Sequence, residues 1–135
     1  MNKALLSIEN LACGYHQQAV VKDLSLSLAA GEIACLLGPS GCGKTTTLRA
    51  IAGLEPVTDG SIRIGERTVS SRQQQLPPEQ RGLGMVFQEH ALFPHLTVAD
   101  NVAFGLRKLP TGQRDQRVKE CLARVRLAGM EARYP

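Results

Sequence analysis

The stretch IACLLGPSGCGKTT, from Ile33 to Thr46, decides the fold of this chain. It begins with an apolar run, 33–37, in which no polar residue alternates, and this pattern predicts a short β-strand buried on both faces. The residues that follow, 38–45, match G-x-x-x-x-G-K-[ST], the pattern of a phosphate-binding loop between a strand and a helix. The stretch therefore predicts an α/β fold that binds a nucleotide.

The residue types in this loop suit a chain of phosphates. Glycines let the backbone curl so that successive N–H groups point toward one anion. Lys44 can reach the β and γ phosphates, and the hydroxyl of Thr45 is placed to bind Mg²⁺. A helix that begins near Lys44 directs the positive end of its dipole at the same anions. The candidate nucleotide-binding residues of the loop are Gly38, Pro39, Ser40, Gly41, Cys42, Gly43, Lys44, Thr45 and Thr46.

The composition is typical of a soluble globular protein, with 43% hydrophobic and 21% charged residues among 135. No apolar run approaches the ~18 residues of a membrane span, and the first residues lack the apolar core of a signal peptide. Aromatic residues make up only 4% of the chain and Trp is absent, which argues against a nucleic-acid partner. The net charge of +4 comes from an excess of Lys and Arg after residue 102, which we interpret as a solvated helix face.

The remaining pattern predicts short strands and helices. We expect strands over 4–9, 19–28, 61–64 and 68–69, helices over 44–52, 97–106 and 115–128, and a polar surface loop over 70–82. Val118, Leu122 and Val125 mark the apolar face of the last helix. Thr97 and Asp100 form a capping box that opens the helix before it.

A second apolar run, Gly84 to Phe87, predicts a second buried strand, and Gln88 follows it. A nucleotide hydrolase of this type needs an acidic residue at such a strand end to hold Mg²⁺. Glutamine cannot replace a carboxylate as a charged partner, although it can touch the metal or orient a water. Two buried strands are also fewer than a doubly wound sheet contains, so we expect an incomplete chain of marginal stability.

The whole chain resembles the ATP-binding subunits of ABC transporters, bacterial importers in particular. GPSGCGKTT, residues 38–46, is similar to the Walker A loop of that family, and MVFQEHALFPHLTVADNVAFGL, residues 85–106, is similar to its Q-loop region. The resemblance implies that Tyr15 stacks on adenine, that Lys44 and Gln88 serve catalysis, and that Thr45 and Gln88 bind Mg²⁺.

The resemblance also implies an architecture, that of the N-terminal portion of an α/β P-loop ATPase of the ABC type. Residues 1–32 and 60–83 then form mainly an antiparallel β-subdomain, and 33–53 form the phosphate-loop strand and helix. Residues 84–96 form the Q-loop, and 97–135 begin the helical subdomain. The family's Leu-Ser-Gly-Gly-Gln signature, Walker B Asp-Glu pair and switch histidine do not occur, so we do not expect this chain alone to hydrolyse ATP.

The resemblance implies that the parent protein hydrolyses ATP to drive solute uptake, with ATP and Mg²⁺ bound. Two copies would associate head to tail, and the segment Glu89 to Leu96 would meet the membrane permease. The protein would then be peripheral, at the cytoplasmic face of the inner (plasma) membrane. The run LPPEQRGLGMVFQEHALFPHLTV, residues 76–98, resembles ferric-iron importers most, with polyamine and sulfate importers close behind.

Three alternatives remain open. A nucleotide kinase or small GTPase would share the loop, but it would need an acidic strand end and a base-reading motif of its own. A soluble ABC protein of repair or translation would share more, but Phe93 to Thr97 resembles an importer's membrane-docking segment. The third alternative is a protein that binds nucleotide without turning it over.

Overall fold

The structure, a computed structural model, describes the backbone of residues 4–15, 18–89 and 91–135. It divides into two units, Met1–Met85 and Val86–Pro135, and each is described by itself. In the described part of the chain, no helix is long and apolar enough to cross a membrane.

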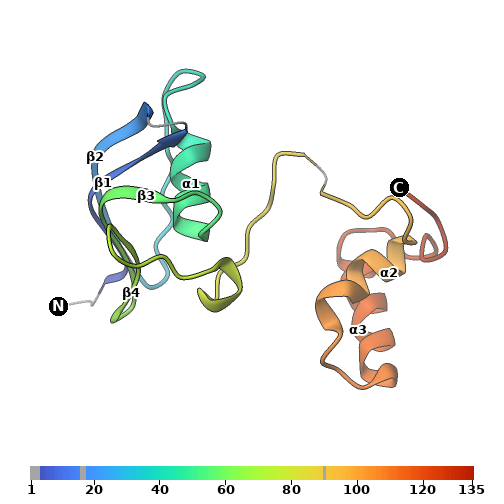
Figure 1. Cartoon of the computed structure of the whole chain (residues 1–135). Helices are drawn as coiled ribbons and strands as arrows, with labels where there is room; N and C mark the ends of the chain where they lie inside the picture. Colours follow the sequence, from blue (N-terminus) through green and yellow to red (C-terminus); the bar gives the residue numbers. More distant parts are fainter. Residues whose placement is uncertain (1–3, 16–17, 90) are drawn as a thin grey trace. The chain divides into compact units, whose positions relative to one another are not determined.

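The first unit is an antiparallel sheet with one helix (Figure 1). Its strands pair in the order β2-β1-β3-β4. Their bounds are β1 (Ala4–Tyr15), β2 (Gln18–Ala29), β3 (Val57–Ile64) and β4 (Arg67–Ser71). The register places Ile8 of β1 opposite Ile62 of β3, and both side chains are buried with Leu11 and Val69. The predicted antiparallel sheet is confirmed, and its strands are longer than the sequence pattern indicates.

Helix α1 (Lys44–Ala52) has the predicted bounds, because a glycine stands at each end. Gly43 before it and Gly53 after it have φ angles of 97° and 85°, in the left-handed region that glycine adopts without strain. Ala50 of α1 is buried in the same cluster as the apolar residues of the sheet. The helix is therefore anchored to the sheet by a small residue that allows a close approach.

The second unit contains α2 (Val98–Ala103), a 3₁₀ turn, η2 (Phe104–Leu106), and α3 (Thr111–Arg124). The hydroxyl of Thr97 accepts a hydrogen bond from the backbone N–H of Asp100 at 3.1 Å, so the predicted cap of α2 is confirmed. Helix α3 begins and ends earlier than predicted. Val118 and Leu122 are buried as expected, but Val125 lies beyond the helix end and is 62% exposed.

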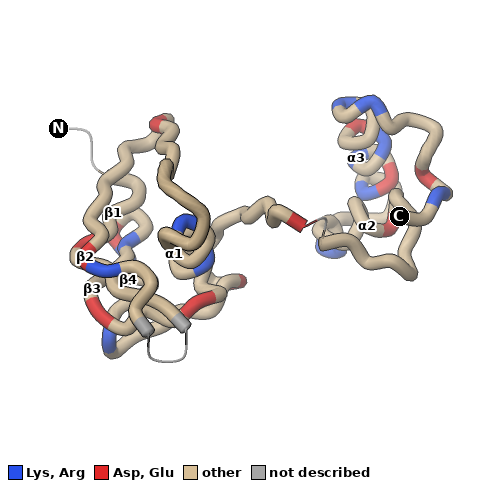
Figure 2. The backbone as a smooth tube through the Cα atoms, turned by 90° about the horizontal axis from the view of Figure 1, so that it is seen from above, with Lys and Arg blue, Asp and Glu red and all other residues tan. Residues whose placement is uncertain are grey.

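Charges of both signs lie along α3 (Figure 2). The guanidinium of Arg117 lies 3.0 Å from the carboxylate of Glu120, one turn further along. This pair is exposed to solvent, so it contributes little to stability. The basic excess of the sequence is thus partly balanced on α3, where Asp115 and Glu120 accompany four basic residues.

The two predicted buried strands are wrong for this structure. Residues 33–37 and 84–87 form no strand, and Ile33, Leu37 and Val86 are 97%, 87% and 97% exposed. An apolar run becomes a strand only where neighbouring strands pair with its backbone groups. The four named strands of the described chain pair with one another instead. The pattern indicates that a segment is suited to burial, and it does not guarantee the partners that bury it.

The polar segment 70–82 is not a surface loop throughout, because its Arg81 is only 5% exposed. Arg81 follows a short 3₁₀ turn, η1 (Pro78–Gln80), and its side chain turns inward. Its guanidinium donates four hydrogen bonds, to Leu76 O (2.8 Å), Ala50 O (2.9 Å), Ile51 O (3.0 Å) and Ser70 Oγ (2.8 Å). Burial lowers the pKa of Arg81 from its ordinary value. A buried arginine thus occupies the C-terminal end of α1.

Candidate functional site

The phosphate loop, residues 38–45, requires glycine at defined positions. Gly41 and Gly43 have φ angles of 81° and 97°, which residues with a side chain rarely adopt. A Cβ atom on Gly43 would also lie 2.7 Å from Cγ2 of Val21 in β2, closer than atoms can pack. Glycine at this position therefore serves both the turn and the close contact between the loop and the sheet.

The ammonium group of Lys44 lies against the backbone of the loop. Its Nζ donates to the carbonyl oxygens of Gly38 at 2.8 Å and Pro39 at 2.7 Å. The Sγ of Cys42 lies 3.5 Å from the same nitrogen. These contacts hold the positive charge within the loop that the motif assigns to phosphate.

The N-terminus of α1 adds to this positive charge. Among the described residues, no side chain caps this end of the helix, and its first turn contains no acidic residue. The first N–H groups of a helix have no partner within it, and the helix dipole is positive at that end. An ammonium and the start of a helix, without a capping carboxylate, form a site for an anion.

The hydroxyls at the start of α1 differ in access. Thr45 is exposed, whereas Thr46 and Thr47 are 5% and 3% exposed. The hydroxyl of Thr47 donates to Gly43 O at 2.9 Å, a contact within the helix. Among these three residues, Thr45 alone presents an accessible oxygen, which fits its predicted role toward Mg²⁺.

Elsewhere in the described chain, no group of three or more His, Cys, Asp or Glu side chains is placed to hold a metal. A Mg²⁺ at the loop would find the residue Thr45 exposed, and which further groups would hold the metal stays a prediction.

A hollow of about 590 Å³ lies between β2 and the phosphate loop. Residues 19–24 of β2 form one wall, and Cys42, Gly43, Lys44 and Thr47 form the other. The volume lies within the range of small-molecule sites, roughly 300–1,000 Å³. One wall presents β2 and the other presents the loop, so a ligand in the hollow would contact both.

Three of the predicted site elements are not joined to this hollow by the structure. Tyr15 ends β1, but its side chain lies outside the described part of the chain. Gln88 is exposed and belongs to the second unit, so its position relative to Lys44 stays a prediction. The segment 89–96 also belongs to the second unit, and His90 within it is not described.

Two residues with extensive contacts gave no signal in the sequence. Arg81 looks like one charged residue of a polar loop, and Asn101 looks like one polar residue of an amphipathic helix. Both bond mainly to backbone oxygens, which every residue carries. Residue-type patterns cannot reveal such partners.

The chain is similar to curated ATP-binding proteins over almost all of its length. It is 48% identical over 130 residues to the putative 2-aminoethylphosphonate import ATP-binding protein PhnT of Salmonella typhimurium, which covers 95% of this chain and 34% of that protein. It is 45% identical over 134 residues to the Fe(3+) ions import ATP-binding protein FbpC 1 of Pectobacterium atrosepticum, covering 98% of this chain and 37% of that protein. It is 47% identical over 130 residues to the spermidine/putrescine import ATP-binding protein PotA of Rubrobacter xylanophilus, covering 95% and 33%. The chain thus spans about a third of the length of these relatives.

A solved structure has the same fold. The ATP-binding cassette MJ0796, in a dimeric post-hydrolysis state with ADP and Pi, matches 96% of this chain and 61% of its own, with a TM-score of 0.82 and 27% identity. The expected fold, the N-terminal portion of an ABC ATPase, is therefore confirmed. Residues 21–135 match the family described as ABC transporter, and this chain belongs to that family.

Proposed function

We propose that this chain acts in the ATP-binding subunit of a bacterial ABC importer, in which ATP hydrolysis drives solute uptake. The observation that carries the proposal is the hollow beside the phosphate loop, where the ammonium of Lys44 and the start of α1 meet. The names of three relatives, each an import ATP-binding protein, support the link to uptake.

In this proposal the loop residues 38–46 bind the phosphates of ATP through their backbone N–H groups. Lys44 contacts the β and γ phosphates, and Thr45 would hold Mg²⁺, which when bound neutralises phosphate charge. Tyr15 stacks on adenine, and Gln88 orients a water or touches the metal. The exposed hydroxyl of Thr45 and the contacts of Lys44 within the loop support the first two roles.

We do not propose that this chain hydrolyses ATP on its own. In the sequence the apolar run 84–87 is followed directly by Gln88 and not by a carboxylate, and these residues form no strand whose end would place a metal-binding acid. We propose that these 135 residues bind nucleotide without useful hydrolysis and that ATPase activity needs residues beyond them.

Two partners belong to the proposal. A second copy would pack head to tail across the nucleotide, which the dimeric form of the similar cassette supports. A membrane permease would contact the segment 89–96, where Leu92 is 51% exposed. The protein would then lie at the cytoplasmic face of the inner membrane, and nucleic acid is not a proposed partner.

The cargo we propose is ferric iron, on the resemblance of the run 76–98. Relatives of similar identity are named for 2-aminoethylphosphonate and for spermidine and putrescine, so an uptake assay should compare these solutes in one strain. Loss of iron uptake alone, on deletion of the gene, would support the proposal. Loss of uptake of another of these solutes would identify that solute as the cargo, and it would still support the importer function.

A nucleotide titration tests the core of the proposal. Lys44→Ala should weaken binding of Mg²⁺-ATP by about 10- to 100-fold, because a hydrogen bond to a charged group contributes roughly 1.5–3 kcal/mol. Lys108→Ala removes an exposed cation of the second unit and serves as the matched control, with unchanged affinity. Equal titration heats for Lys44→Ala and the unaltered chain would refute the assignment of the loop.

A further inference from the structure

The segment that precedes α2 is held by one side chain of that helix. The Oδ1 atom of Asn101 accepts from the backbone N–H of Phe93 at 2.9 Å. Its Nδ2 donates to three backbone oxygens, of Phe93 (3.1 Å), Leu96 (3.1 Å) and Thr97 (3.0 Å). All four contacts lie within the second unit and close the chain into a loop around a single amide.

The chemistry of these contacts requires a side-chain amide. The amide presents an acceptor and a donor side by side, and together they match the N–H and C=O of Phe93. Aspartate would keep the acceptor but would turn a carboxylate oxygen toward three carbonyl oxygens. Alanine would remove all four contacts.

The fixed backbone determines how two apolar side chains are presented. Leu92 and Phe93 are 51% and 37% exposed. The ring of Phe93 lies against that of Phe104, with centroids 4.4 Å apart, and the guanidinium of Arg107 lies 3.9 Å from the centre of the Phe104 ring. The contact with the Phe104 ring restrains the side chain of Phe93, and the hydrogen bonds of Asn101 restrain its backbone. Both parts of Phe93 are therefore fixed within the loop.

We propose that Asn101 is a positioning residue for the permease-facing segment: it holds residues 93–97 in the form that presents Phe93 and the adjoining Leu92. This inference rests on the proposed function, because positioning the segment matters only if the segment contacts a permease. The inference assigns a role to a residue outside the segment, on α2, the helix that follows it in the chain.

The test places a photoreactive amino acid at position 92 of the intact subunit and irradiates inner-membrane vesicles of the source bacterium that contain it. The readout is the yield of cross-linked integral membrane protein, identified by mass spectrometry. Asn101→Ala should lower this yield about tenfold, the equivalent of one net hydrogen bond of about 1.4 kcal/mol. Asn101→Asp should lower it similarly, since the NH₂ group, whose two hydrogens serve the three backbone oxygens, is lost.

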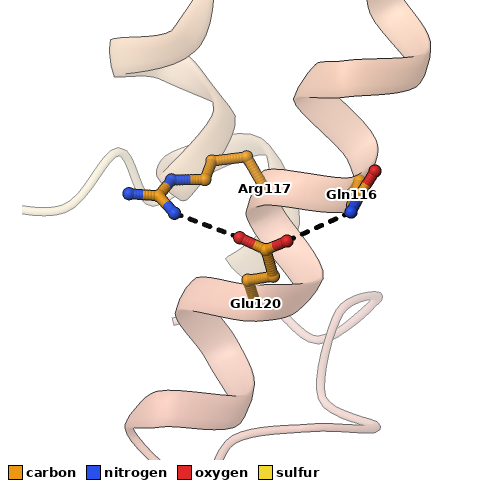
Figure 3. Close-up of polar contacts among 3 residues, drawn as sticks. All are labelled: Gln116, Arg117 and Glu120. Atoms are coloured by element: carbon orange, nitrogen blue, oxygen red, sulfur yellow. Dashed lines mark hydrogen bonds and ion pairs between the residues drawn. The ribbon is translucent and has the colours of Figure 1, made fainter.

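The matched control is Gln116→Ala. This amide lies on α3 and donates to Glu120 at 3.2 Å (Figure 3). It should leave the cross-linking yield unchanged. Nucleotide affinity and helical circular dichroism should stay unchanged in all three variants, which separates positioning from a general loss of folding.

The outcomes distinguish the inference from the function on which it rests. If the unaltered protein cross-links and folded Asn101→Ala or Asn101→Asp cross-links equally well, Asn101 does not position the segment. If Asn101→Ala loses its helical circular dichroism signal, the cross-linking yield of Asn101→Asp is used to judge whether Asn101 positions the segment. If the unaltered protein binds nucleotide but cross-links to no membrane protein, the permease contact is overturned and this inference falls with it.

Discussion

Arg81→Ala should destabilise the first unit much more than its position in a polar segment suggests. The guanidinium is buried and donates to two carbonyl oxygens at the C-terminal end of α1, to Leu76 O and to the hydroxyl of Ser70. Its charge also lies at the negative end of the helix dipole, where a cation is favourable.

The magnitude follows from the acceptors that would be left behind. Ala50 O also accepts from the N–H of Gly53 at 3.2 Å, so it keeps a partner, and the hydroxyl of Ser70 can rotate. The carbonyls of Ile51 and Leu76 each lose a charged donor, at about 1 kcal/mol or more apiece. The dipole interaction contributes up to about 1 kcal/mol. We therefore expect the free energy of unfolding to fall by about 3 kcal/mol.

Urea unfolding followed by far-ultraviolet circular dichroism measures this loss, since the chain contains no Trp for fluorescence. Arg67→Ala is the matched control, because this arginine is exposed and donates to Gln80 O at 3.1 Å. It should cost less than about 0.5 kcal/mol. A loss for Arg81→Ala as small as that of the control would refute the reasoning. If Arg81→Ala does not fold, Arg81→Lys should fold and still lose stability, since one ammonium cannot reach all four acceptors.

Gly53 provides an independent check on the same contact. A Cβ at this position would lie 2.4 Å from Nε of Arg81, and the φ angle of 85° is itself unfavourable for alanine. Gly53→Ala should therefore cost about 1 kcal/mol from the backbone plus a larger amount from the displaced guanidinium. In the Arg81→Ala background only the backbone cost should remain. Additive losses in the double-mutant cycle would mean that the two residues do not act together.

Two further predictions use the same unfolding assay. Hydrogen bonds from Arg117 and Gln116 hold the pKa of Glu120 below its ordinary value, so this group adds stability above the ordinary Glu pKa and loses it as the pH falls through the lowered folded pKa (Figure 3). Glu120→Gln should flatten the decline of the urea midpoint as the pH falls below the ordinary Glu pKa, and an unchanged slope would contradict the pKa direction. Ile33→Ser should change the unfolding free energy by less than about 0.5 kcal/mol, because the side chain is 97% exposed. A loss above about 2 kcal/mol would contradict this exposure and would support the predicted buried strand over 33–37.

The features that the sequence predicted correctly depend on neighbours along the chain. The bounds of α1 follow from Gly43 and Gly53, and the start of α2 follows from Thr97 and Asp100. The phosphate-loop motif also depends only on residue types at fixed spacing, and its role in binding phosphate stays a prediction. Such features need no knowledge of what lies elsewhere in the fold.

The features that were missed depend on distant partners. The run 33–37 has the composition of a buried strand, but no other strand of the described chain pairs with it. The predicted bounds of α3 lie too far along the chain because the apolar spacing included Val125, whereas the helix ends at Arg124. Arg81 and Asn101 reach backbone oxygens on other elements or loops, and no residue type marks those oxygens in advance.

The two ends of α1 explain how one element serves both stability and binding. At its C-terminal end the carbonyls of Ala50 and Ile51 receive the charge of Arg81, so the negative pole of the helix is compensated inside the protein. At its N-terminal end no described side chain caps the helix and its first turn contains no acidic residue, and Lys44 adds an ammonium beside it. A helix compensated at one end only keeps a net positive potential at the other, which is the end that faces the hollow beside β2. On this argument the buried arginine and the phosphate loop are two parts of one electrostatic arrangement, although only the loop carries a recognisable motif.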